Sequence, residues 1–190
     1  MSEQILALRI QELERDSFHE HRGKLVETYK EVYSAQLNDP FFSPERYWDR
    51  LVAYAGRDGF RAVVGDFDGA LVGYALGYTL PAESPWWGGL LSNVDARTLV
   101  ETGDRTFALN EIMVRERWRR RGIARRLHDA LIKQVTAERA TLLVLPDNVA
   151  AQAAYRGWGW QKLGELQPFH DAPVYDAMIL NLTNSRFAAG

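Results

Sequence analysis

The sequence predicts an α/β fold with one twisted, mixed and mostly antiparallel sheet of six or seven strands, flanked by about four helices. The first observation is its size and composition: 190 residues, 46% hydrophobic and 25% charged, describe one ordinary globular domain spanning 1–190. The second is the order of hydrophobic periods, which runs β, α, α, β, β, β, α, β, α, β, β. The third is a strand, helix, strand unit in the middle of this order, which predicts a parallel pair.

The first 37 residues predict one strand and one helix. Alternating apolar residues over 5–13 indicate a strand. Ser17 and Glu20 then have the spacing of a capping box, and helical intervals follow, so we expect a helix over about 18–37.

A second helix is expected to follow directly. Ser43 is its predicted N-cap and Pro44 its first residue, because proline lacks the amide that this position leaves unbonded. Gly56 or Gly59 ends it.

Residues 60–80 predict a hairpin, since two β-rich runs flank an Asp-Phe-Asp-Gly turn in which Gly69 supplies a positive φ. No clear period marks 81–104, and a loop of that length is usually functional or mobile. The remaining predicted elements are a strand over 105–115, a helix over 119–135, a strand over 140–146, a helix over 148–159, a pairing segment over 159–165 and a last strand over 172–182.

Composition excludes several classes of function. The chain has no cysteine, so it has no disulfides and no thiolate chemistry, and a reducing cytoplasmic location is expected. Its first residues lack a basic, apolar leader, and no apolar run is long enough to span a membrane. A net charge of -2 argues against nucleic acid as the partner. No zinc motif is present, and we expect no metal.

The stretch RERWRRRGIARRLHDAL, residues 115–131, has seven arginines in its first twelve positions. Gly122 stands where the chain must turn from strand to helix, and Ala124 is small, so backbone amides of the first helical turn are left uncovered. Such amides favour a phosphate or pyrophosphate. An apolar stripe packs the helix on the sheet; it consists of Ile123, Leu127, Ala130 and Leu131.

Two motifs in this region resemble the GNAT superfamily of N-acetyltransferases. The family's cofactor loop, Gln/Arg-x-x-Gly-x-Gly/Ala, is met by Arg119, Gly122 and Ala124. About 25 residues later the family has Asn-x-x-Ala followed by Tyr-x-x-x-Gly-aromatic, matched here by Asn148, Ala151, Tyr155, Gly159 and Trp160. Tryptophan replaces the usual phenylalanine. The resemblance covers about 57–182, with a cofactor core over about 105–165 and acceptor-side helices over about 17–56.

The resemblance implies acetyl-CoA as co-substrate. Its pantetheine arm would pair between two splayed parallel strands, at 111–115 and 143–145, and its pyrophosphate would lie on the amides of the arginine turn. The implied cofactor-binding residues are Ile112, Met113, Val114, Arg119, Arg120, Arg121, Gly122, Ile123, Ala124, Arg125, Asn148 and Ala151.

Two residues are candidates for catalysis. Tyr155 matches the tyrosine that protonates the departing thiolate, although it could be a packed core residue. Glu111 is the candidate base, and the alternative is a structural carboxylate paired with a nearby arginine. Asn110 and Asn148 could hold water or cofactor, with helix capping equally open for Asn148. Histidines are expected at the surface, His128 among the polar positions of its helix.

The expected acceptor is a primary amine of a small molecule, or a peptide N-terminus or lysine. Aromatic residues could line its pocket or simply cover the sheet: Phe41, Phe42, Tyr47, Trp48, Trp86 and Trp87. Acidic residues near the long loop could steer a cation: Glu83, Asp95 and Glu101. Two alternatives stay open, a CoA-binding module without catalysis and an acyltransferase for longer chains. A homodimer is possible, because the last strand could pair across a two-fold axis or remain an edge.

Overall fold

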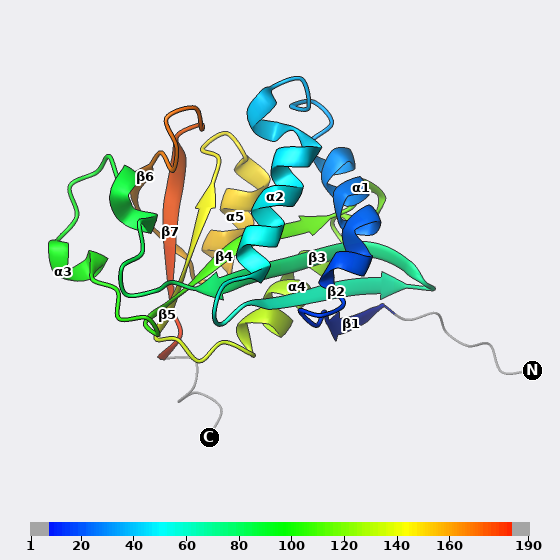
Figure 1. Ribbon diagram of the computed structural model, residues 1–190, viewed down its shortest axis with the longest axis horizontal. Helices are drawn as coiled ribbons and strands as arrows, with labels where there is room; N and C mark the ends of the chain where they lie inside the picture. Colours follow the sequence, from blue (N-terminus) through cyan, green and yellow to red (C-terminus); the bar gives the residue numbers. More distant parts are fainter. Residues whose placement is uncertain (1–7, 184–190) are drawn as a thin grey trace, which may run out of the picture. The chain divides into compact units, whose positions relative to one another are not determined.

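A computed structural model describes residues 8–183 and divides into two compact units, one formed by 8–78 and 111–135 and the other by 79–110 and 136–183. The strands form a seven-stranded sheet in the order β1-β2-β3-β4-β5-β7-β6, in which only β4 and β5 pair in parallel (Figure 1). The predicted order of strands and major helices is therefore confirmed, including the pairing of the segment near 159–165 as β6, while one short helix at Ala96–Leu99 was not predicted.

The first unit contains the N-terminal elements and the helix that follows the arginine turn. Its strands are β1 (Arg9–Glu12), β2 (Arg61–Phe67), β3 (Ala70–Thr79, of which residues up to 78 belong here) and the end of β4 (Thr106–Val114). Its α-helices are α1 (Arg22–Val32), α2 (Pro44–Ala55) and α4 (Ile123–Ile132), with 3-10 turns at Phe18–His21, Pro40–Phe42 and Glu116–Trp118.

Helices cover both faces of this part of the sheet (Figure 1). Leu25 and Tyr29 of α1 and Tyr47 and Leu51 of α2 are buried in one core together with alternate residues of β2 and β3, among them Ala62, Val64, Tyr74 and Leu76. The other face carries α4, whose buried stripe includes Ile123, Leu127 and Leu131. The predicted amphipathic packing of this helix is confirmed.

Local signals set the ends of α2 as expected, but those of α1 differ. The Ser43 hydroxyl accepts a hydrogen bond from the amide of Arg46 at 3.3 Å, as an N-cap should. Ser17 makes no such bond, because its backbone is already helical and its hydroxyl donates to the carbonyl of Glu14 at 3.2 Å. The predicted capping box is wrong, and α1 begins at Arg22 after a 3-10 turn.

The second unit contains the start of β4, the short helix α3 (Ala96–Leu99), β5 (Arg139–Val144), α5 (Val149–Gly157), β6 (Gln161–Leu166) and β7 (Tyr175–Asn181). β7 pairs with β5 on one side and β6 on the other, both antiparallel. The last strand is thus interior, and the expectation that it forms an edge or pairs across a two-fold axis is wrong. A homodimer stays a prediction, but it can no longer be argued from the last strand. The tail at 184–190, which was expected to cover an edge strand, lies outside the described residues.

The long loop of the second unit is ordered around a buried ion pair. One oxygen of Glu101 accepts from Arg139 at 3.0 Å, from the indole of Trp87 at 2.8 Å and from Thr106 at 2.9 Å. Both members of the ion pair are nearly enclosed, with side-chain exposures of 10% and 2%. Glu101 is therefore a structural anchor, contrary to the expectation that it steers a cation, and Asp95 caps α3.

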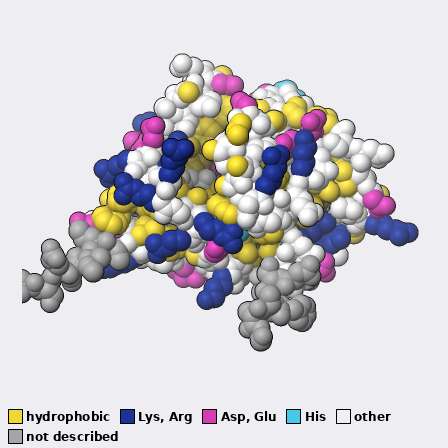
Figure 2. Space-filling view, turned by 180° about the vertical axis from the view of Figure 1, so that it is seen from behind, with side chains coloured by type: hydrophobic (Ala, Val, Ile, Leu, Met, Phe, Trp, Pro, Cys, Tyr) yellow, Lys and Arg dark blue, Asp and Glu magenta, His cyan; other side chains and the backbone are white. Residues whose placement is uncertain are grey.

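Two surface properties bear on the sequence-based predictions. Within residues 8–183 no helix is long and apolar enough to cross a membrane. On the face seen in Figure 2, lysine and arginine side chains are scattered among acidic and apolar ones.

Gly73 allows the closest backbone approach in the first unit. A Cβ added to it would collide with the Met113 carbonyl oxygen and would lie 3.2 Å from the Cα of Val114 and from Leu127 Cδ1. A side chain on β3 at this point would therefore displace both the end of β4 and α4.

We expect Gly73→Ala to lower the free energy of unfolding by about 2 kcal/mol or more, since overpacking cannot be relieved by moving a backbone carbonyl. Denaturant unfolding followed by circular dichroism measures the change. Gly23→Ala in α1 is the matched control, because nothing lies within 4 Å of its added Cβ and alanine favours a helix. Equal stability of Gly73→Ala and wild type would contradict the close approach.

Candidate functional site

Pairing between the two parallel strands stops early. β4 and β5 are in register only from Thr106 opposite Arg139 to Ala108 opposite Thr141, although β5 continues to Val144. Beyond this point Asn110 Oδ1 is buried and accepts no hydrogen bond from any residue in the described range. The backbone of β5 and the Asn110 side chain thus leave hydrogen-bonding capacity unused where a ligand strand is expected.

Glu111 lies in the part of β4 that belongs to the first unit, beside a group of buried tyrosines. Tyr29 and Tyr47 stack with their ring centroids 3.7 Å apart. The hydroxyls of Tyr47 and Tyr74 share a hydrogen bond, and the Tyr74 hydroxyl also donates to the sulfur of Met113 at 3.3 Å. The carboxylate of Glu111 acts electrostatically on these three phenols.

Burial dominates the electrostatics of this group. It raises the pKa of Glu111 from 4.5 to about 7, and the positive charge of Arg50 opposes the shift. Burial, with the added effect of the Glu111 carboxylate, also raises the pKa of Tyr29 to about 12 and those of Tyr47 and Tyr74 well above their usual value. The phenols therefore stay neutral, and Glu111 titrates near neutral pH while keeping partial contact with solvent.

The arginines that follow Glu111 in the sequence are engaged elsewhere, which weakens the alternative that Glu111 is a structural partner of one of them. Arg115 pairs with Glu31 at 3.4 Å and donates to Thr28 at 3.3 Å. Arg119 donates to the carbonyl of Val114 at 3.3 Å. Arg50 donates to the carbonyl of Phe41 at 3.3 Å, and its charge still acts on Glu111. A carboxylate with a pKa near 7 is suited to accept a proton at neutral pH.

The arginine turn has the backbone expected of an anion-binding loop. Gly122 is the N-cap of α4 with φ 73°, a left-handed conformation, and no side chain caps the helix there. The amide of Arg126 makes the first bond of the helix, to the carbonyl of Gly122 at 3.1 Å. The amides of Ile123 and Ala124 precede it and have no acceptor within the helix, as at every helix start. Space around Gly122 is open, with no atom within 4 Å of an added Cβ.

The arginine side chains diverge from this backbone. Arg125 pairs with Asp129 at 2.7 Å, one turn along α4. Arg121 lies over the indole of Trp118, 5.0 Å from the ring centroid. Arg120 adopts φ 61°, which is unusual for a residue with a side chain. The predicted cofactor residues Ile112, Met113 and Val114 lead into the turn from β4, with Met113 and Val114 buried.

The second predicted motif lies in the second unit and forms α5. The side chain of Asn148 accepts a hydrogen bond from the amide of Ala151 at 3.2 Å, so Asn148 caps this helix. Tyr155 is 8% exposed and makes edge contacts with the rings of Trp158 and Trp160. Of the alternatives open for Asn148, the structure shows the cap.

Sequence reasoning missed the surroundings of Glu111 and misplaced one histidine. Tyr74, Tyr29 and Arg50 are not among the predicted site residues; the density of aromatics in the two N-terminal helices is a signal for Tyr29, and no local signal marks the other two. His128 is 3% exposed and hydrogen-bonds to Asp129 at 2.8 Å, so the expectation of a polar surface position is wrong. It directly follows Leu127 on the buried side of α4.

Several solved structures have a fold similar to that of this chain. PH1933 from Pyrococcus horikoshii OT3 is 14% identical with a TM-score of 0.69, covering 93% of this chain and 99% of that one. The ribosomal-protein-S18-alanine N-acetyltransferase of Escherichia coli is 15% identical, TM-score 0.62, covering 93% and 94%. The PaiA N-acetyltransferase of Thermoplasma acidophilum, in complex with coenzyme A, is 11% identical, TM-score 0.56, covering 92% and 99%.

The sequence itself gives the family. None of the curated proteins matches the chain. Residues 15–160 match the Acetyltransferase (GNAT) family, a span that includes the tyrosine group, the arginine turn and α5. Since this match covers most of the chain and the fold agrees with it, the chain belongs to the GNAT acetyltransferase family.

Proposed function

We propose that the chain transfers the acetyl group of acetyl-CoA to a primary amine, either of a small molecule or of a peptide N-terminus or lysine. The observation that carries this proposal is Glu111, a carboxylate whose pKa is raised to about 7 and which is not held by the arginines near it in sequence. Because the chain lacks cysteine, we further propose that it works in a reducing compartment, the cytoplasm.

The residues of the arginine turn and of the two motifs fit the cofactor. The open space at Gly122 and the uncapped start of α4 suit a pyrophosphate. The unused acceptor of Asn110 and the shortened β4–β5 register suit an extended amide-bearing chain. The proposed binding residues are Ile112, Met113, Val114, Arg119, Arg120, Gly122, Ile123, Ala124, Arg125, Asn148 and Ala151; Arg121 is considered in the next subsection.

Acetyl-CoA, when bound, supplies an activated acetyl group as a thioester. The acceptor attacks the acetyl carbon directly as a neutral amine, and the carboxylate of Glu111 accepts the proton that the nitrogen loses as the carbon–nitrogen bond forms. A backbone amide near Met113 donates a hydrogen bond to the acetyl oxygen as it gains charge. The phenol of Tyr155 gives its proton to the departing sulfur. One proton is thus taken from the nitrogen and one is returned to the sulfur, while a carbon–nitrogen bond replaces a carbon–sulfur bond.

A CoA-binding module without catalysis and an acyltransferase for longer chains are the competing functions. Free thiol release separates the first from the enzyme, because a module binds acetyl-CoA without consuming it. A series of acyl-CoA esters of increasing length addresses the second. The amine panel includes a peptide with a free N-terminus, a lysine peptide and an aromatic amine, since the likeness to the S18-alanine enzyme extends only to the fold.

Glu111→Gln is expected to lower kcat/KM by about 10²–10⁴, the usual worth of a general base. In wild type, kcat/KM should rise with pH up to an inflection near 7, where the carboxylate becomes deprotonated. The variant should lack that inflection, while any titration of the amine itself remains. Thiol release between pH 5 and 9 measures both profiles, and an unchanged inflection in the variant would contradict the assignment.

Stability provides the control for this variant. Because the folded state holds the Glu111 proton up to about pH 7 and the unfolded state releases it near 4.5, wild type loses stability as pH rises through this window. Glutamine does not titrate, so we expect Glu111→Gln to be more stable than wild type at pH 8 by ~1–2 kcal/mol, allowing for partial solvent contact. Lost activity therefore cannot be attributed to unfolding if the variant is the more stable protein.

Tyr155→Phe is expected to slow acetyl transfer by about 10–100-fold, because the departing sulfur then takes its proton from water. Binding of acetyl-CoA, measured by calorimetric titration, should change by less than about threefold, since only the hydroxyl is removed. Trp158→Phe is the matched control on the same packed ring group. Equal rates for Tyr155→Phe and wild type would assign Tyr155 to the core instead.

Gly122→Leu is expected to weaken acetyl-CoA binding at least tenfold, because a side chain covers the amides of α4 and the positive φ is lost or strained. Gly69→Leu is the matched control. It also stands at a positive φ, 78°, with nothing within 4 Å of an added Cβ, but in the β2–β3 turn. Calorimetry on both variants compares them at equal backbone strain. Wild-type affinity in Gly122→Leu would show that the pyrophosphate does not lie on this turn.

A further inference from the structure

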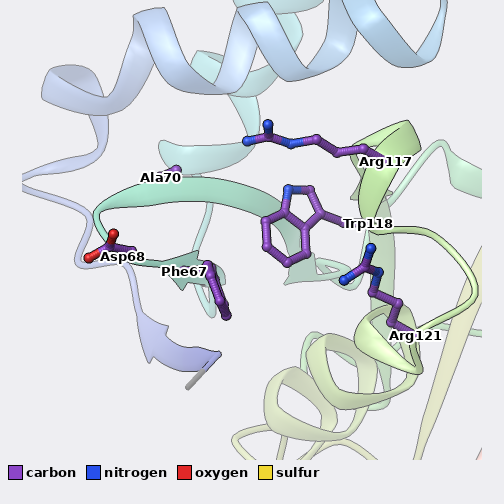
Figure 3. Close-up of a pocket in the computed structure, with 6 residues that line it drawn as sticks. All are labelled: Phe67, Asp68, Ala70, Arg117, Trp118 and Arg121. Carbon is purple, nitrogen blue, oxygen red and sulfur yellow. The ribbon is translucent and has the colours of Figure 1, made fainter. Parts of the chain in front are cut away.

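A pocket opens beside the arginine turn, within the first unit (Figure 3). Its volume is about 340 Å³, near the lower end of the range for small-molecule sites. It lies between the β2–β3 hairpin turn and the 3-10 turn that follows β4, and its lining consists of Phe67, Asp68, Ala70, Arg117, Trp118 and Arg121.

The pocket is built around an aromatic platform. The rings of Phe67 and Trp118 pack with their centroids 4.7 Å apart at 48°. The indole Nε1 of Trp118 is buried and donates to no residue within 8–183. Together with the methyl group of Ala70, these rings give an apolar wall against which a flat ring can stack.

Two guanidinium groups flank this platform. Arg117 lies 5.5 Å and Arg121 5.0 Å from the centre of a Trp118 ring. Both side chains are exposed, and neither has an acidic partner in the part of the chain that the structure describes. In Figure 3 the carboxylate of Asp68 points away from the indole, at the rim of the pocket. The lining therefore carries two arginines without an acidic partner and one carboxylate, Asp68, which points away from the indole.

We propose that this pocket binds a planar aromatic carboxylate, whose ring packs against the apolar wall of Phe67, Ala70 and Trp118 and whose negative charge is attracted by Arg117 and Arg121. Guanidinium groups match carboxylates in geometry as well as in charge, and the apolar wall favours a ring over a simple inorganic anion. The volume suits one or two fused rings. The site is separate from the proposed acetyltransferase chemistry, and it assigns Arg121 to this ligand instead of to the phosphates of the cofactor.

Binding of 2-naphthoate tests the proposal, measured by saturation-transfer NMR and calorimetry on the full chain. We expect binding that weakens at least fivefold in Arg117→Gln and in Arg121→Gln, and at least tenfold when the neutral amide 2-naphthamide replaces the acid. Arg22→Gln is the matched control, because its guanidinium also lies over a tryptophan, 5.6 Å from the ring of Trp48, but outside the pocket. It should leave the affinity unchanged.

Four outcomes would overturn the proposal. If 2-naphthoate does not bind, or if 2-naphthamide binds equally well, the pocket does not recognise a carboxylate. Displacement of 2-naphthoate by inorganic phosphate at equal concentration reduces the pocket to a simple anion site. Competition between acetyl-CoA and 2-naphthoate would show that the pocket is part of the cofactor site. Since Arg117 and Arg121 are exposed, their variants should fold, and a wild-type melting temperature confirms it. Thiol release is measured separately, so failure here leaves the proposed enzyme activity untouched.

Discussion

The contact between Gly73 and the backbone of Met113 is the constraint on which the first unit depends. It permits a close approach of β3 and β4 that any side chain at position 73 would prevent, and Leu127 of α4 fills the adjoining space. The amide of Arg115 then bonds to the carbonyl of Val72 at 2.9 Å, which fixes where the strand ends and the arginine turn begins. A missing side chain in the hairpin thus determines the position of Glu111 and of the turn.

The phenols around Glu111 explain how a carboxylate near neutral pKa is maintained there. Aliphatic residues would desolvate it as well but would leave its oxygens and nearby backbone groups without polar neighbours. Tyrosines bury a large apolar ring and remain neutral, since burial raises their own pKa values. Their hydroxyls are used internally, Tyr29 on the carbonyl of Phe42 at 2.9 Å and Tyr74 on Met113. The wall is therefore fixed by hydrogen bonds without adding charge beside the base.

Features encoded within a few residues could be predicted from the sequence, and those that depend on distant partners could not. The Ser43 cap, the Gly69 turn and the left-handed Gly122 follow from local backbone chemistry and are confirmed. The Ser17 cap has the same kind of signal but fails, because its hydroxyl bonds backwards to Glu14. The interior position of β7 depends on pairing across some 35 residues with β5, and no local period carries it.

The residues of the candidate site also divide into those with a local sequence signal and those that depend on distant partners. The turn is predicted by the family motif and Glu111 by its place in the strand before it, whereas Arg50 and Tyr74 reach Glu111 only through packing of α2 and β3. The arginines show it most clearly: one sequence cluster supplies groups with different partners. Arg119 and Arg125 are turned onto β4 and α4, while Arg117 and Arg121 face the Trp118 indole. Exposed charges are screened by water and salt, so arginines this close in sequence can take separate partners. The packing of each side chain, and not its place in the cluster, therefore determines which group it contacts.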